Sequence, residues 1–204
     1  MLDHLVYAGP DLAEAVARVK ELTGVTPAPG GSHVGVGTAN HLADLGAGVY
    51  LVVVGPDPAQ PEPARKRPFG IDELTGPALV AWAVRTTDLD ATIAAARAHG
   101  FDPGDAVEMS RETADGELLR WRLTPPSVPG TLTPFLIDWG STPHPTTRGL
   151  PSLPLLMVTG AHPDPDSVLA VTDALGLELL VRRADRAGLI AALRTPEGRQ
   201  VALS

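Results

Sequence analysis

The chain repeats one pattern three times. Each copy contains a short apolar segment, a turn with an Asp, a stretch rich in Ala, Leu and Val, and a closing Gly. The copies lie at residues 4–24, 81–100 and 157–176. The three Asp residues are evenly spaced: Asp88 lies 77 positions after Asp11 (88 minus 11), and Asp164 lies 76 positions after Asp88 (164 minus 88). A Gly follows the first Asp after 13 positions and the other two after 12 positions each. Self-similarity at a fixed spacing indicates that the chain builds one supersecondary unit several times.

Each repeat predicts a strand, a helix and three further strands. The Asp side chain accepts the free backbone N–H groups of the first helical turn, and the Gly adopts the left-handed conformation that ends the helix. In the third copy Pro165 takes the first helical position, where its missing N–H costs nothing. Apolar segments of strand length, separated by turn residues, follow each helix. Because one helix covers only one face of such a sheet, the other face must close against a second unit or form a cup.

We therefore predict an α+β fold of tandem β-α-β-β-β modules. Two modules, at about 1–70 and 78–145, pair within residues 1–145 and form a curved half-barrel. A third, truncated module follows at 151–204. The linker at 141–151, which contains two Pro-flanked turns, marks the boundary.

The composition is that of a globular chain with a sizeable core. Of the 204 residues, 44% are hydrophobic and 20% are charged, which excludes a disordered, collagen-like or coiled-coil chain. No apolar stretch approaches about 18 residues, and Asp3 stands where a signal peptide carries positive charge. We expect a soluble, cytoplasmic protein without a membrane partner. The heavy use of Ala, Gly, Pro and Arg is typical of bacteria with GC-rich genomes.

The charge and the missing cysteines exclude further classes. A formal net charge of -8 repels nucleic acid, and the densest basic run, residues 65–67, is interpreted as a solvated loop, so we expect no nucleic-acid partner. The chain has no Cys, which excludes disulfides, thiolate metal sites and a cysteine nucleophile.

Several short motifs occur in an order and spacing that resemble a known superfamily. They are LDHLVY (residues 2–7), PDL (10–12), GSHVGVGTAN (31–40), YL (50–51), GPD (55–57), WAVRT (82–86), LRWRL (119–123) and PFLIDWG (134–140). Together with the tandem units, they resemble the vicinal-oxygen-chelate superfamily of glyoxalase I, extradiol dioxygenases and bleomycin-resistance proteins. The chain is most similar to the glyoxalase-like domain branch of that group.

The resemblance implies a divalent cation inside the cup, held by side chains from the first and last strands of each module. His4 occupies one such position, but the equivalent positions in the other units are Ala81 and Met157, which cannot ligate a hard cation. Val52 stands where the family tends to place a Glu, and the second module offers Asp138. We therefore expect a degenerate metal site, with no resident metal or other cofactor. Members of the superfamily that only bind a compound share the fold without a metal.

Strand alternation assigns side chains to the two faces of the sheet. If His4 faces the cup, so do Tyr50, Val52, Val54, Arg85, Leu136 and Asp138. Trp82 and Trp139 then pack under the helices. If Trp121 also packs under a helix, Arg120 and Arg122 enter the cup. Guanidinium groups bind carboxylate or phosphate in a bidentate manner, so such a cup attracts a small anion. The alternative is that one Arg forms a structural ion pair with Asp138 and the other is solvated.

A glycine-rich segment at 29–41 contains His33 and Asn40. It has no Gly-Lys-Ser/Thr ending and no long helix after it, so it is not a phosphate-binding loop. Glycine lets a backbone approach a ligand, and the two polar side chains supply donors and acceptors. The segment is interpreted as part of a binding site; a plain hairpin turn with a solvent-facing His is the alternative.

These features predict a protein that binds a small, anionic organic compound in a β cup. The predicted binding residues are His4, His33, Asn40, Arg85, Arg120, Arg122 and Asp138. If the protein is an enzyme, His4 or His33 is the acid–base candidate. One alternative is a divalent-metal lyase or dioxygenase that uses His4 and Asp138 together with water or a ligand from the third unit. Another is a structural or partner-binding module without a small ligand, whose third unit pairs with another subunit. A homodimer is the assembly that we expect.

Overall fold

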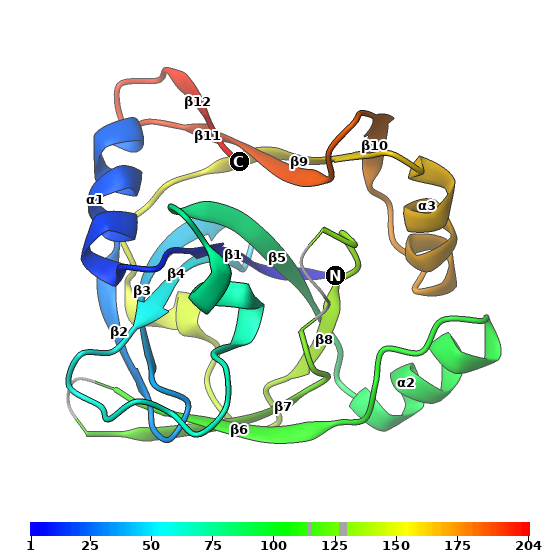
Figure 1. Ribbon diagram of the computed structural model, residues 1–204, viewed down its shortest axis with the longest axis horizontal. Coiled ribbons are helices and arrows are strands. Elements are labelled where there is room, and N and C mark those ends of the chain that lie inside the picture. The colour runs from blue at the N-terminus through cyan, green and yellow to red at the C-terminus, as the bar shows by residue number, and fades with distance from the viewer. Residues whose placement is uncertain (114–115, 127–129) are drawn as a thin grey trace.

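The computed structural model describes residues 1–113, 116–126 and 130–204 of the chain. Two β-α-β-β-β units together form one barrel (Figure 1). The first unit consists of β1 (Leu2–Ala8), α1 (Leu12–Thr23), β2 (Ala28–His33), β3 (Thr38–Gly46) and β4 (Val49–Pro56). The second consists of β5 (Ala78–Arg85), α2 (Leu89–Ala98), β6 (Val107–Glu112), β7 (Leu118–Leu123) and β8 (Phe135–Asp138). Two short 3-10 helices, η1 (Pro68–Glu73) and η2 (Pro145–Arg148), follow the first and second units.

Side-chain capping starts two of the three helices. The Asp11 carboxylate accepts from the Glu14 amide at 3.0 Å, and the Asp88 carboxylate accepts from the Ala91 amide at 2.9 Å. The predicted bond is wrong for the third helix, because the Asp164 side chain makes no capping bond there. The glycines that follow all three helices have the predicted left-handed backbone, as shown by a φ of 76° at Gly24.

The sheet closes completely in the order β1-β4-β3-β2-β6-β7-β8-β5. In each unit the first strand runs parallel to the fourth, and the two units meet where β1 pairs antiparallel with β5. At the other seam, β2 approaches β6 through the Ser32–Glu112 pair. Gly31 makes this approach possible, because a Cβ on it would lie 2.0 Å from the Glu112 carbonyl oxygen. The predicted α+β class and paired modules are confirmed, and the sheet closes further than a half-barrel.

The third unit has the same five elements but a different strand pairing. They are β9 (Leu155–His162), α3 (Pro165–Ala174), β10 (Leu180–Arg183), β11 (Gly188–Arg194) and β12 (Gln200–Leu203). Their sheet has the order β10-β9-β11-β12, so the first strand is parallel to the second strand of the unit instead of the fourth. In Figure 1 this sheet lies across the outside of the barrel, and β11 contacts β5.

Alternation along the strands divides the apolar residues into two clusters. Side chains of one parity, such as Val6, Tyr50 and Phe135, point into the barrel. Those of the other parity, such as Leu5 and Trp82, pack outward against the helices and the third sheet. The barrel interior is therefore separated from the outer core by a single layer of backbone. Within the described ranges, no helix is both long and apolar enough to cross a membrane.

Candidate functional site

The barrel encloses a cavity of about 440 Å³. Its wall is largely aromatic and apolar, formed by side chains that include Tyr50, Phe69, Met109, Trp121, Phe135 and Trp139. Its polar side chains include His4, His33, Thr38, Asn40 and Arg111, and Arg65 and Lys66 also line it. Among the described lining residues there is no Asp or Glu. The cavity is thus apolar, with basic groups and no lining carboxylate to balance them.

Three of the predicted binding residues line the cavity, and three others point away from it. His4, His33 and Asn40 lie in the wall. Arg120, Arg122 and Asp138 are on the outer face of β7 and β8, so their predicted orientation is wrong.

The aromatic residues explain the error. The Trp121 and Trp139 rings lie 5.2 Å apart inside the barrel. The prediction placed Trp139 under a helix, and the arginines could enter the cup only if Trp121 packed there too. Their neighbours along the strands therefore face outward, and Arg122 forms two hydrogen bonds, at 2.8 and 2.9 Å, with Asp90 at the start of α2. An exposed ion pair therefore lies on the outer face of the strand, where the prediction needed Trp121. Leu136 likewise faces the outer core rather than the cup.

The remaining two predictions have separate outcomes. Trp82 faces outward as predicted, and its indole N–H donates to the Leu132 carbonyl at 2.8 Å. Arg85 does not line the cavity. Its Nε lies 3.7 Å from an Asp3 carboxylate oxygen.

A β-bulge brings Asp3 and His4 together. Neighbouring residues of a regular strand point to opposite faces, but the pairing of β1 with β5 shifts between Leu2 and His4, where Asp3 is the extra residue. The His4 Nδ1 atom consequently lies 2.6 Å from Asp3 Oδ1. His4 is 5% exposed and Asp3 is fully buried.

Asp3 is the centre of a buried hydrogen-bond cluster. Besides His4, its carboxylate accepts from His144 Nε2 at 3.0 Å and from the Trp139 indole at 3.2 Å. Burial alone would raise the pKa of Asp3, but the hydrogen bonds that its carboxylate accepts from His144 and His4 outweigh burial and hold that pKa well below its usual range. Asp3 is therefore an anion at neutral pH.

An ionised Asp3 fixes the tautomer of neutral His4. A carboxylate only accepts hydrogen bonds, so Nδ1 must carry the proton in the 2.6 Å contact. The lone pair is then on Nε2, and within the described part of the chain no hydrogen bond occupies that atom. Because His4 lines the cavity, Nε2 is available to a molecule bound there.

Arg111 was missed by the sequence interpretation and is the buried cation of the cavity. It is 4% exposed, and its Nη1 donates to Asn40 Oδ1 at 2.9 Å. No carboxylate of the described residues pairs with it, and its Nε has no hydrogen-bond partner there. Burial lowers the pKa of Arg111, as expected for a charge that is poorly compensated. Gly30 leaves room for this pair, because a Cβ there would lie 2.2 Å from Asn40 Oδ1 and 2.6 Å from Arg111 Nη1.

The sequence did contain a signal for Arg111. The strand β6 continues through its polar residues to Glu112. Val107 and Met109 of β6 line the cavity. Because side chains alternate between the two faces of a strand, the next residue of β6 that faces the cavity is Arg111.

His33 lies in the cavity wall close to this cation. Its Nδ1 is 3.0 Å from the Thr38 hydroxyl. Burial and the charge of Arg111 lower the pKa of His33 from 6.5 to about 4. His33 is therefore neutral at physiological pH and acts as a hydrogen-bonding group.

The low pKa of His33 predicts a loss of stability in mild acid. Between pH 6.5 and about 4 the unfolded chain binds a proton at this residue and the folded chain does not. The free energy of unfolding should therefore fall by about 2 kcal/mol from this residue as the pH drops from about 7 to about 5. Urea unfolding at both pH values measures the drop. The drop in the free energy of unfolding should be smaller by about 2 kcal/mol in His33→Gln, which lacks the titrating group. The control His99→Gln, which changes an exposed histidine, should show the wild-type drop. Equal drops in the wild type and both variants would contradict the prediction.

The donor set does not fit the divalent cation that the fold family implies. His4 and His33 are the only His, Asp or Glu side chains among the described lining residues, and Val52 and Ile137 occupy the inward positions of β4 and β8. No cluster of three or more His, Asp and Glu side chains able to hold a metal occurs in ranges 1–113, 116–126 and 130–204. The alternative that uses His4 and Asp138 fails geometrically, because Asp138 faces outward.

The chain matches a known protein family. The family model described as a glyoxalase-like domain matches residues 2–176. No curated protein sequence matches the chain.

Several solved structures are similar to this chain at low sequence identity, and the first two named here, with TM-scores above 0.5, share its fold. A hypothetical protein from Staphylococcus aureus is 13% identical with a TM-score of 0.65, over 98% of this chain and 84% of that one. A mutant of 4-hydroxymandelate synthase from Streptomyces coelicolor is 15% identical with a TM-score of 0.53, over 99% of this chain and 61% of the synthase. Methylmalonyl-CoA epimerase from Mycobacterium tuberculosis is 20% identical with a TM-score of 0.44, over 72% of this chain and 91% of the epimerase.

Proposed function

Since the chain belongs to the glyoxalase-like domain family of the vicinal-oxygen-chelate superfamily, we propose that its barrel binds a small organic anion without the help of a metal. One observation carries the proposal. Arg111 is a buried cation in the cavity wall, and the described residues provide no carboxylate for it. An uncompensated charge in an apolar site costs several kcal/mol, so the missing partner is best supplied by a ligand.

The shape and lining of the cavity describe the rest of the ligand. A volume of about 440 Å³ suits a small organic molecule. The aromatic rings of Trp121, Trp139 and Phe135 favour an apolar body, which they contact while a carboxylate lies against the Arg111 guanidinium. His33 and Asn40 add neutral hydrogen-bonding groups beside the same cation. The proposed ligand is therefore a carboxylate with an aromatic or similarly apolar body.

The proposal includes a degenerate metal site. It is supported by the apolar residues at the inward positions of β4 and β8 and by the lack of any Asp or Glu among the described lining residues. The formal net charge of -8 favours a small ligand over nucleic acid. A cytoplasmic location and a homodimer remain predictions.

A thermal-shift experiment tests the binding proposal. The probe is 3-benzoylpropionate, which has a phenyl ring, a ketone and a carboxylate, and its matched control is the uncharged methyl ester. The acid should add about RT ln(1 + [L]/Kd) to the free energy of unfolding and thereby raise the melting temperature. The ester should not raise it, because only the acid pairs with Arg111. Equal shifts with acid and ester would contradict the assigned anion site. No shift with any carboxylate well above its plausible Kd would favour a structural module without a small ligand.

Elemental analysis tests the metal-free part separately. Protein purified without chelator should contain well under one equivalent of Fe, Mn, Ni, Zn or Co. A stoichiometric metal that disappears in His4→Ala would overturn the degenerate site.

A further inference from the structure

We propose that the cavity is catalytic and that His4 is its general base, positioned by Asp3 to take a proton from the bound anion. This inference rests on the proposed function, because the anion must first bind beside Arg111. It goes beyond binding, since a site that only holds a carboxylate needs no oriented imidazole. The bulge at Asp3 is a departure from regular strand geometry that places a carboxylate directly behind His4.

The geometry assigns separate roles to the two residues. Asp3 is fully buried and does not line the cavity, so it is a positioning residue. His4 lines the cavity, with Nδ1 bound to Asp3 at 2.6 Å and Nε2 unoccupied among the described residues. His4 is held from the sides as well, with its ring centroid 4.8 Å from that of Tyr50 and 5.4 Å from that of Phe135. A base whose rotamer and tautomer are fixed before binding loses little freedom in the reaction.

The other two histidines of the region are not suited to the task. His144 shares Asp3, but its Nε2 donates to that carboxylate and its Nδ1 lies 2.8 Å from the Thr146 hydroxyl, so both nitrogens are occupied. No carboxylate of the described residues is hydrogen-bonded to the His33 ring, and the neighbouring charge of Arg111 disfavours an imidazolium there. His4 is the one of the three with both an anionic partner and a free nitrogen.

The proton transfer balances without any other reactant. A C–H bond next to a carbonyl group of the ligand breaks, its proton forms a new N–H bond on His4 Nε2, and its electron pair remains on the ligand as an enolate. The positive charge on the imidazole is compensated by Asp3, and the cationic Arg111 in the same cavity favours the added negative charge. Return of the proton to the ligand regenerates His4. In deuterium oxide, the returning proton is replaced by deuterium.

Deuterium exchange into 3-benzoylpropionate, followed by proton NMR, tests this step. The methylene group next to the ketone should lose its proton signal faster with the wild-type protein than in buffer. His4→Gln should lower this enzymatic rate at least about 100-fold, the usual size of a general-base contribution, while the carboxylate still produces its thermal shift. Asp3→Asn should lower the rate constant for turnover more than it raises KM. His99→Gln, which changes an exposed histidine just after the end of α2, should exchange at the wild-type rate.

The outcomes separate this proposal from the proposed function. Absence of a thermal shift overturns carboxylate binding. Three results overturn the assignment of His4 as the base. They are a normal thermal shift without deuterium exchange, exchange that survives in His4→Gln, and loss of exchange in His33→Gln alone. Because Asp3→Asn removes a buried charge and can prevent folding, the tautomer of His4 in the wild type gives an independent measurement. Long-range ¹⁵N NMR should find Nδ1 protonated and Nε2 unprotonated, and the opposite tautomer overturns the proposal.

Discussion

Replacing Arg111 by methionine should stabilise the ligand-free protein and abolish its affinity for carboxylates. The buried guanidinium has one hydrogen bond to Asn40 and no carboxylate partner among the described residues. Its desolvation costs several kcal/mol, more than the about 1–3 kcal/mol lost when the Asn40 oxygen loses its donor. We expect the free energy of unfolding to rise by about 1–2 kcal/mol, and the Kd for 3-benzoylpropionate to rise at least about 100-fold.

A substitution that raises the free energy of unfolding but lowers the affinity for the carboxylate shows that the charge binds a ligand and does not stabilise the fold. Urea unfolding of the ligand-free protein gives the first quantity and the thermal shift gives the second. Arg122→Met is the matched control, because Arg122 pairs with Asp90 in solvent and an exposed pair contributes about 1 kcal/mol or less. Its affinity for the probe should be that of the wild type. A large loss of stability in Arg111→Met with retained affinity would show that Arg111 is a structural residue.

The sequence was sufficient for the fold because its signals are local and repeated. The capping Asp and closing Gly of each repeat act within one helix, and two of the three caps form as expected. The pairing of the third sheet could not be read in this way. Its elements have the same order as in the first two units, but β9 pairs with β10, and hydrogen-bond partners between strands do not depend on element order alone.

The candidate site was predicted less completely because the choice of strand face was uncertain. A strand that alternates Arg and apolar residues, such as β7, reads equally well in either orientation, and a one-residue change exchanges the two faces. The prediction buried Trp121 under a helix, which put Arg122 in the cup. The structure fills the barrel with aromatic side chains instead, and the cation comes from Arg111 on the neighbouring strand. The contact between Asp3 and His4 could not be predicted, because it depends on a bulge in the pairing of β1 with β5.

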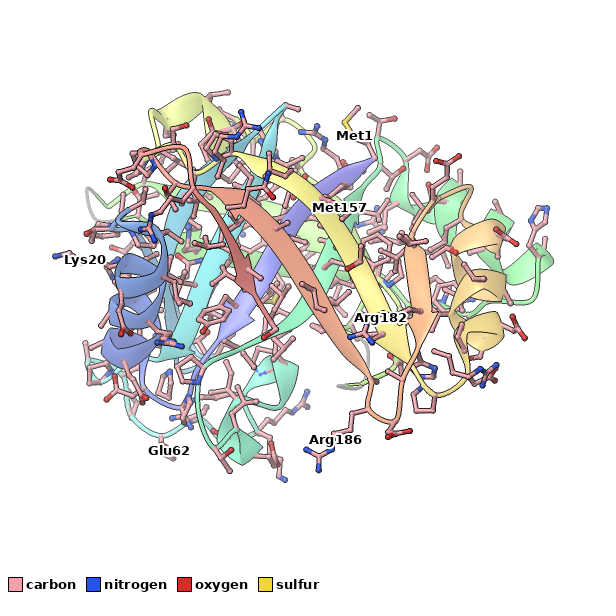
Figure 2. The ribbon with its side chains drawn as sticks, turned by 90° about the horizontal axis from the view of Figure 1, so that it is seen from above. Met1, Lys20, Glu62, Met157, Arg182 and Arg186 are labelled. Carbon is pink, nitrogen blue, oxygen red and sulfur yellow. The ribbon has the colours of Figure 1, made fainter. Side chains whose placement is uncertain are left out.

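The third sheet should be part of the same cooperative unit as the barrel. Its inner side chains, including Leu189 and Leu193, belong to one continuous apolar cluster with Leu5 and Trp82 of the barrel. Figure 2 views the opposite, outer face of this sheet, where Met157 is 52% exposed. A sheet that shares its core with the barrel cannot unfold without exposing the outer surface of β1 and β5.

Leu193→Ala is therefore expected to destabilise the whole protein by about 2–5 kcal/mol in one transition, because it opens a cavity in the shared core. Leu193 is 0% exposed, and the same substitution at Leu180, which is 68% exposed, should change stability by about 0.5 kcal/mol or less. Far-UV circular dichroism follows all three sheet units. Fluorescence is measured in a Trp82→Phe background, because Trp82 packs against the third sheet, and it then follows Trp121 and Trp139 inside the barrel. Coincident unfolding curves are expected for both variants. An early transition seen by circular dichroism alone, with binding of 3-benzoylpropionate retained beyond it, would show instead that residues 151–204 fold as a separate domain and leave the cavity intact when they unfold.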